Sequence, residues 1–94
     1  MSALDDIAAE RKRQIEVEGW SVEHDDRHDC GEMADAAAVY AMQPSFRICN
    51  HMLDNLWPWS REWWKPANRR RDLVKAGALI VAEIERLDRS DDKP

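Results

Sequence analysis

The sequence predicts an all-α fold, a small bundle of three to four helices with a long acidic loop and a tryptophan-rich connection. Three segments repeat apolar side chains with helical spacing. No segment alternates β-branched with polar residues, and neither Asn-Gly nor Asp-Gly hairpin turns occur. With 94 residues the chain fits a single domain, which we expect over residues 1–89, followed by a frayed polar tail over 90–94.

The first helix is expected over residues 3–18, with Gly19 as its stop signal. Arg11 and Glu18 fall on the same side of this helix as its apolar positions. Their side chains either extend from the edge of that face into solvent or border a polar pocket. The apolar positions that predict the buried face are Leu4, Ile7, Ala8 and Ile15.

The second helix is expected over residues 30–42. Asp29 is the predicted N-cap, and Glu32 completes a pair that resembles a capping box. Pro44 ends the helix, and a further short helix fits residues 45–56. The predicted buried stripe contains Met33, Ala37, Tyr40 and Ala41.

The third helix is expected over about residues 68–88 and has the most regular pattern. Apolar residues recur at intervals of four and three, which predicts one continuous buried face. Three further residues, Ala76, Ala78 and Val81, widen that face. The recurring positions are Leu73, Gly77, Ile80, Ile84 and Leu87.

The charge composition conceals two opposed segments. Lys+Arg number 14 against 19 Asp+Glu, a net charge of -5. Acidic residues gather in 21–35 and basic residues in 61–75, and the overall acidity argues against sequence-specific nucleic-acid binding.

No apolar run reaches the roughly 18 residues of a membrane span, and the N-terminus lacks a signal peptide, so we expect a cytoplasmic protein. Cys30 and Cys49 are expected to be free thiols, and the thin core of so short a chain favours a homo-oligomer.

The acidic loop over residues 19–29 and the start of the next helix are rich in hard metal ligands. Glu32 and Asp35 share a helix face, as carboxylate pairs do in Mg²⁺ sites. A solvated or salt-bridged loop is the alternative, and we favour it over a metal site. The metal-ligand candidates are His24, Asp25, Asp26, His28, Glu32 and Asp35.

The segment over residues 57–71 combines four tryptophans with five basic residues. Indole rings stack on nucleobases and cations bind phosphate, so this pattern favours a nucleotide site. Core packing and a protein interface are alternatives, and we expect at least one of the four indoles to be partly exposed. Three arginines at a helix start need an anionic partner, either a ligand or the acidic loop of the same chain. The ligand-binding candidates are Arg11, Trp20, Trp57, Trp59, Trp63, Lys65, Arg69 and Arg70.

Three segments together resemble a family of small phage and prophage proteins over nearly the whole chain: ERKRQIEVEGWSVEHDDRHDCGEMADAAAVYA, WPWSREWWKP and RRRDLVKAGALIVAEIERLDR. This resemblance implies a viral or prophage origin and action in the host cytoplasm. A second resemblance, to the ryanodine-receptor repeat domain, implies a helical module that senses nucleotide-derived ligands. It rests on Glu18-Gly19-Trp20, Asp25-Asp26, Pro58-Trp59, Lys65 and Asn68-Arg69.

A third resemblance is to the MazG-like pyrophosphohydrolases, which hold Mg²⁺ with carboxylate pairs on two helices. Glu32 and Asp35 match the second pair, while the first helix offers Glu18. We therefore expect, first, a phage protein that binds a nucleotide or nucleotide-derived signal, without cofactor or catalysis, and that sequesters a host defence signal. The alternatives are a Mg²⁺-dependent nucleoside-triphosphate pyrophosphohydrolase using Glu18, Glu32 and Asp35, and an interaction module that inhibits a host protein.

Overall fold

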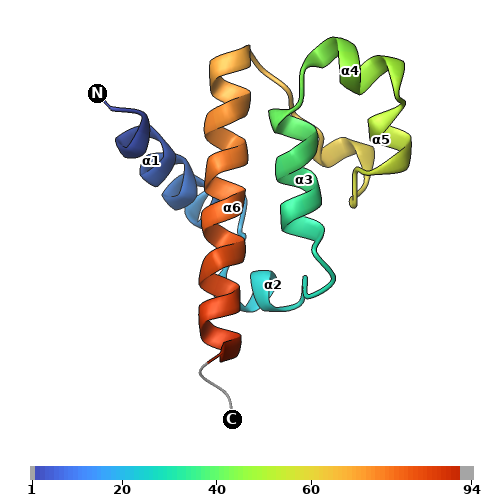
Figure 1. Ribbon diagram of the computed structural model, residues 1–94. Coiled ribbons are helices and arrows are strands. Elements are labelled where there is room, and N and C mark those ends of the chain that lie inside the picture. Colours follow the sequence, from blue (N-terminus) through green and yellow to red (C-terminus); the bar gives the residue numbers. More distant parts are fainter. Residues whose placement is uncertain (1, 92–94) are drawn as a thin grey trace.

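A computed structural model describes residues 2–91, and these residues form helices and connections without any strand. Three long helices are α1 (Ala3–Glu16), α3 (Glu32–Ala41) and α6 (Arg69–Asp91). The connections between them contain α2 (Val22–Asp26), α4 (Pro44–Cys49), α5 (Met52–Asn55) and a 3₁₀ turn at Arg61–Trp63. The predicted all-α fold is confirmed, and the helices beyond the expected three to four are short. Figure 1 shows α6 standing between α1 and α3.

The hydrophobic core lies mainly between α3 and α6. Met33 and Val39 of α3 and Leu79 of α6 are fully buried, and alanines surround them on both helices. Small side chains let the two helix axes approach closely, as the alanine run in α3 predicts. At one end of this core Tyr40 packs edge-on against Trp57, with ring centroids 5.6 Å apart.

The predicted buried face of α6 is confirmed at Ala76 and Ala78, which were expected to widen it, but it is wrong for the recurring positions at its centre. Four of these five positions, Leu73, Ile80, Ile84 and Leu87, are between 43 and 51% exposed. The fifth, Gly77, faces α1, where a Cβ atom would come within 2.8 Å of Ile7. The side of α6 that packs on α3 is lined instead by Ala76, Leu79 and Ala82, all of which are buried. Periodicity located an apolar stripe correctly, but the neighbouring face, rich in alanine, is the one that α3 covers.

The buried face of α1 is polar, which also corrects the sequence prediction. Leu4 is 78% exposed, whereas Glu10, Arg11 and Gln14 are buried against the rest of the molecule. Buried charges need partners. Glu10 binds Arg13 of the same helix and Arg71 of α6, so α1 docks on α6 largely through ion pairs.

The start of α3 differs from the expected capping box. Its N-cap is Gly31, in the left-handed conformation with φ +85°, and not Asp29. The carboxylate of Glu32 still reaches back and accepts a hydrogen bond from Cys30 N at 2.7 Å. The expected helix over 45–56 is divided at Asn50 and His51, because His51 adopts a positive φ of 52°.

The C-terminal end of the described chain is helical. Ser90 and Asp91 belong to α6, so the expected frayed tail is wrong for these two residues, and 92–94 lie outside the described part. Within residues 2–91 no helix has the length and apolar character to span a membrane.

Candidate functional site

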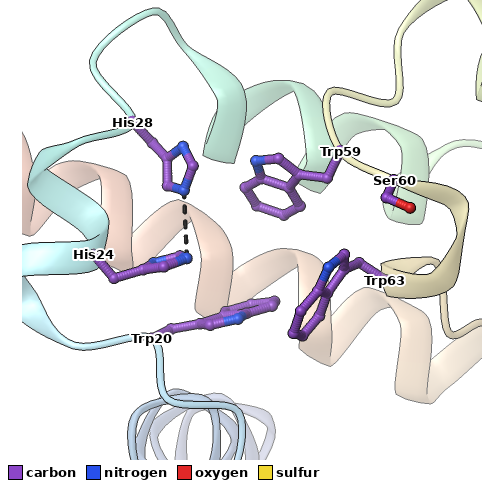
Figure 2. A pocket seen from close by; sticks show the side chains of 6 residues that line it. All are labelled: Trp20, His24, His28, Trp59, Ser60 and Trp63. Atoms are coloured by element: carbon purple, nitrogen blue, oxygen red, sulfur yellow. Dashed lines mark hydrogen bonds between the residues drawn. The ribbon is translucent and has the colours of Figure 1, made fainter.

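A pocket of about 260 Å³ lies between two connections of the chain. One wall comes from α2 and the residues on either side of it, and the other from the segment that precedes α6 (Figure 2). The lining is aromatic apart from one serine. We call it the tryptophan pocket, and its residues are Trp20, His24, His28, Trp59, Ser60 and Trp63.

The turn after α1 places the first wall. Gly19 takes a positive φ of 77°, and Trp20 N then donates to Gln14 O at 3.0 Å, which fixes the indole next to the end of α1. Ser21 caps α2 by accepting from His24 N at 3.2 Å. As a result the Trp20 and His24 rings lie parallel, with an interplanar angle of 2° and centroids 6.0 Å apart. Both rings lie on the same side of the pocket (Figure 2).

The tryptophan-rich segment supplies the opposite wall. Trp59 and Trp63 stand at 54° and 52° to the Trp20 ring, with centroids 5.7 and 6.5 Å away. Trp57 anchors this segment because it is only 8% exposed and donates from Nε1 to Ser60 O at 3.1 Å. Trp63 is 37% exposed, which confirms the expectation that one indole of this segment is partly exposed.

One polar atom of the pocket wall has no hydrogen-bond partner among the described residues. It is Trp59 Nε1, which is buried. Figure 2 shows this nitrogen on the side of the indole that faces His28. A buried N–H donor without an acceptor is destabilising, so an acceptor supplied by water or by a ligand would be favoured here.

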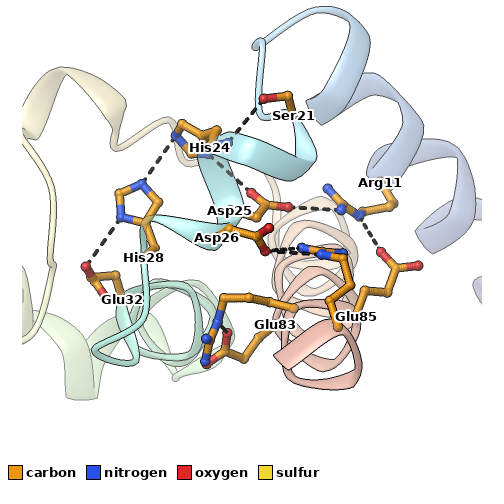
Figure 3. A network of polar contacts seen from close by, with 11 residues as sticks. Arg11, Ser21, His24, Asp25, Asp26, His28, Glu32, Glu83 and Glu85 are labelled. Atoms are coloured by element: carbon orange, nitrogen blue, oxygen red, sulfur yellow. Dashed lines mark hydrogen bonds and ion pairs between the residues drawn. The ribbon is translucent and has the colours of Figure 1, made fainter. Parts of the chain in front are cut away.

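Each imidazole of the pocket has a carboxylate next to its Nδ1 atom, on the side away from the cavity (Figure 3). His24 Nδ1 lies 3.2 Å from Asp25 Oδ1, and His28 Nδ1 lies 3.4 Å from Glu32 Oε2. Asp25 is fully buried and also binds Arg11 Nη2 at 3.0 Å. Burial would raise the pKa of Glu32, but bonds from its own N–H, the Cys30 N–H and His28 outweigh it and the pKa is lowered. Glu32 is therefore held ionised.

One lysine lies beside the pocket without lining it. Lys65 Nζ is 5.4 Å from the centroid of the Trp63 ring and 3.1 Å from Glu18 Oε2. Burial would raise the pKa of Glu18, but Lys65 and Arg13 more than offset this, so the pKa is lowered. The Lys65 side chain is about half exposed and reaches solvent at the rim.

The arginines expected to bind a ligand are placed elsewhere. Arg69 donates to Ala41 O and Met42 O at the end of α3, and Arg70 pairs with Asp6 of α1 at 2.7 Å. Arg11 is buried and bound to Asp25 and Glu85. The expected staple between residues 69–71 and the acidic loop is therefore wrong, because carboxylates of α1 bind Arg70 and Arg71, and carbonyl oxygens at the end of α3 bind Arg69. Trp57, also expected in the ligand site, belongs to the core.

The metal-ligand candidates separate into two groups. His24 and His28 face the pocket, whereas Asp25 and Glu32 lie behind them. Asp26 pairs with Arg89 of α6 at 2.7 Å, so the acidic loop is at least partly salt-bridged. Among residues 2–91 no three or more His, Cys, Asp or Glu side chains form a group that could hold a metal ion. Cys30 and Cys49 are exposed free thiols, as expected.

The acidic loop and the tryptophan-rich segment were predicted as separate candidate regions, and the structure joins part of each in one pocket. The missed signal is the spacing of four between Trp20, His24 and His28, which predicts neighbouring side chains along a helical turn. No pattern in the sequence indicated that this group would face Trp59 and Trp63. In comparisons with known proteins, no family model, curated protein or solved structure matches the chain.

Proposed function

We propose that the protein binds a nucleotide or nucleotide-derived signal by stacking its base in the tryptophan pocket, without catalysing a reaction. The observation that supports this most directly is the convergence of three indoles and two imidazoles around one cavity. A volume of about 260 Å³ is slightly below the range of about 300–1,000 Å³ for drug-sized ligands. It therefore suits a base, with the sugar and phosphates extending out of the pocket.

The ring geometry favours a flat ligand. Trp20 and His24 lie parallel and each offers a flat ring face, and Trp59 and Trp63 are tilted so that they contact the edges of a ring lying on the Trp20 face. Stacking a base on an aromatic side chain stabilises binding by about 1–3 kcal/mol. The free Trp59 Nε1 donor adds a bond to an acceptor atom such as a ring nitrogen or a carbonyl oxygen.

Lys65 is the basic residue best placed for a phosphate. Its ammonium lies over the Trp63 ring, next to the pocket rim, and it gives up only a partly exposed pair with Glu18. Such pairs contribute about 0–1 kcal/mol, so exchanging Glu18 for a phosphate costs little. Arg11, Arg69 and Arg70 do not line the pocket and bind groups elsewhere in the fold, so they drop out of the proposed contacts.

Sequestering a nucleotide signal of host defence is the use that we propose for this binding. It rests on the resemblance to small phage and prophage proteins, together with the resemblance to a nucleotide-sensing module. The resemblance to phage and prophage proteins also implies that this action takes place in the host cytoplasm.

Calorimetric titration of the full chain with linear and cyclic nucleotides tests the proposal. Trp63→Ala removes a partly exposed wall, so the core stays intact, and we expect it to weaken binding about 5- to 150-fold. Lys65→Ala should weaken the binding of phosphorylated ligands and leave the affinity for the free nucleoside unchanged. Arg70→Ala is the matched control, because it removes a basic side chain that pairs with Asp6, and it should bind as the wild type does.

Two results would contradict the proposal. The first is that no nucleotide binds, and the second is that Trp63→Ala binds as tightly as the wild type. Pyrophosphate release from nucleoside triphosphates with Mg²⁺, lost in Glu32→Gln and retained in Trp63→Ala, would favour the pyrophosphohydrolase instead.

A further inference from the structure

The two imidazoles of the tryptophan pocket face each other through the ring nitrogens that point into it. His24 Nε2 and His28 Nε2 lie 3.3 Å apart (Figure 2). Each Nδ1 lies against a carboxylate oxygen, of Asp25 and Glu32 respectively (Figure 3). Since an ionised carboxylate only accepts hydrogen bonds, these partners assign the ring proton to Nδ1 in both residues. Both Nε2 atoms then present lone pairs to one another.

Two lone pairs at this distance repel each other unless an electrophile, either a proton or a metal ion, lies between them. In a tetrahedral zinc site the Zn–N distance is about 2.0–2.1 Å, which separates two ligating nitrogens by about 3.3–3.4 Å. The distance between His24 Nε2 and His28 Nε2 matches that value. We propose that His24 and His28 together bind one divalent transition-metal ion, such as Zn²⁺ or Ni²⁺, through their Nε2 atoms.

The donor atoms determine the kind of metal. Imidazole nitrogens suit zinc, copper and nickel, whereas Mg²⁺ prefers oxygen ligands in an octahedral arrangement. The carboxylates of Asp25 and Glu32 are then outer partners that orient the imidazoles, a common arrangement behind metal-binding histidines. This differs from the Mg²⁺ site that the carboxylate pair Glu32 and Asp35 predicts.

The site leaves coordination positions open toward the cavity. Within the described chain no third His, Cys, Asp or Glu joins the two imidazoles. Water, or an oxygen atom of a small ligand, would therefore complete the coordination. An oxygen atom of the base that the proposed function places in this pocket is one such ligand. This last role rests on the proposed function, whereas binding of the metal itself does not.

Calorimetric titration of the nucleotide-free full chain with ZnCl₂, NiCl₂ and MgCl₂ tests the inference. We expect one Zn²⁺ or Ni²⁺ per chain and no heat from Mg²⁺. His24→Ala and His28→Ala should each abolish binding, and Glu32→Gln should weaken it about 10- to 100-fold. The third histidine gives a matched control, because His51 is exposed at the start of α5. His51→Asn should bind as the wild type does, since asparagine tolerates the left-handed conformation at this position.

A second readout does not depend on the variants folding. In the wild-type protein, Zn²⁺ should shift the ¹⁵N resonances of Nε2 in His24 and His28 and leave those of His51 unchanged. The inference is overturned if Zn²⁺ and Ni²⁺ do not bind, if His24→Ala retains binding while folded, or if the shifts appear at His51. Because the probe is the metal alone, these outcomes are independent of whether any nucleotide binds.

Discussion

Replacing Leu79 and Ile84 by alanine, one variant at a time, tests which face of α6 is buried. Leu79 is 1% exposed and packs against α3, whereas Ile84 is 51% exposed on the apolar stripe. Both are apolar side chains of the same size in the same helix. Sequence periodicity alone predicts that Ile84 is the more costly to lose, and the structure predicts the reverse.

The expected magnitudes follow from burial. Leu79→Ala removes a buried side chain and leaves a cavity, so the free energy of unfolding should fall by about 2–5 kcal/mol. The Ile84 side chain is only about half buried. Full burial of such a side chain stabilises a protein by about 1.5–3 kcal/mol, and truncating a half-exposed one leaves no cavity. Ile84→Ala should therefore cost only about 1 kcal/mol. For a domain of this size each kcal/mol corresponds to about 4–8 °C in Tm.

Urea denaturation followed by far-UV circular dichroism measures both variants at two protein concentrations. Equal losses of stability for the two variants, independent of concentration, would refute the burial argument. A loss for Ile84→Ala that grows with protein concentration would instead support the expected homo-oligomer, with the stripe of α6 at the contact between copies.

Two further predictions concern the buried charges. Asp25→Ala should destabilise the protein by about 3 kcal/mol, because Arg11 stays buried with only the half-exposed Glu85 as partner; a loss below 1 kcal/mol by urea denaturation would contradict this. Burial would raise the pKa of Glu10, but Arg13 and Arg71 reverse the effect and lower it below 4.5. Glu10 should therefore stabilise the fold above about pH 4.5, and this contribution should vanish as the pH falls through the lowered pKa; urea midpoints from pH 7 to pH 3 should fall less steeply in Glu10→Gln.

The sequence predicted the helical class and the three long helices, because apolar spacing and stop signals are local properties. It predicted the wrong face of α6, because the large aliphatic residues that dominate the hydrophobic pattern are not the ones that fit a close approach to α3. The small side chains of Ala76 and Ala82 permit that approach, and this preference depends on the partner helix.

The candidate site was predicted in part. The aromatic and imidazole residue types were identified, but the contact between Trp20 and Trp59 joins positions 39 apart in the chain. Local patterns do not report such contacts. The positions of the Arg69 and Arg70 side chains could not be predicted either, because their partners, carbonyl groups at the end of α3 and a carboxylate of α1, are distant in the sequence.

The walls of the tryptophan pocket come from connecting segments, while α3 and α6 hold the core. Segments outside the core open locally at a smaller free-energy cost than the whole domain. Because Trp20 and Trp59 pack against that core and Asp25 is buried, we expect opening to be confined to the more exposed rim around Trp63, while α3 and α6 stay packed. Amide hydrogen exchange should then slow around Trp63 when a ligand or metal occupies the pocket, and stay unchanged in the centre of α6. Exchange of bound molecules is thereby uncoupled from unfolding of the domain.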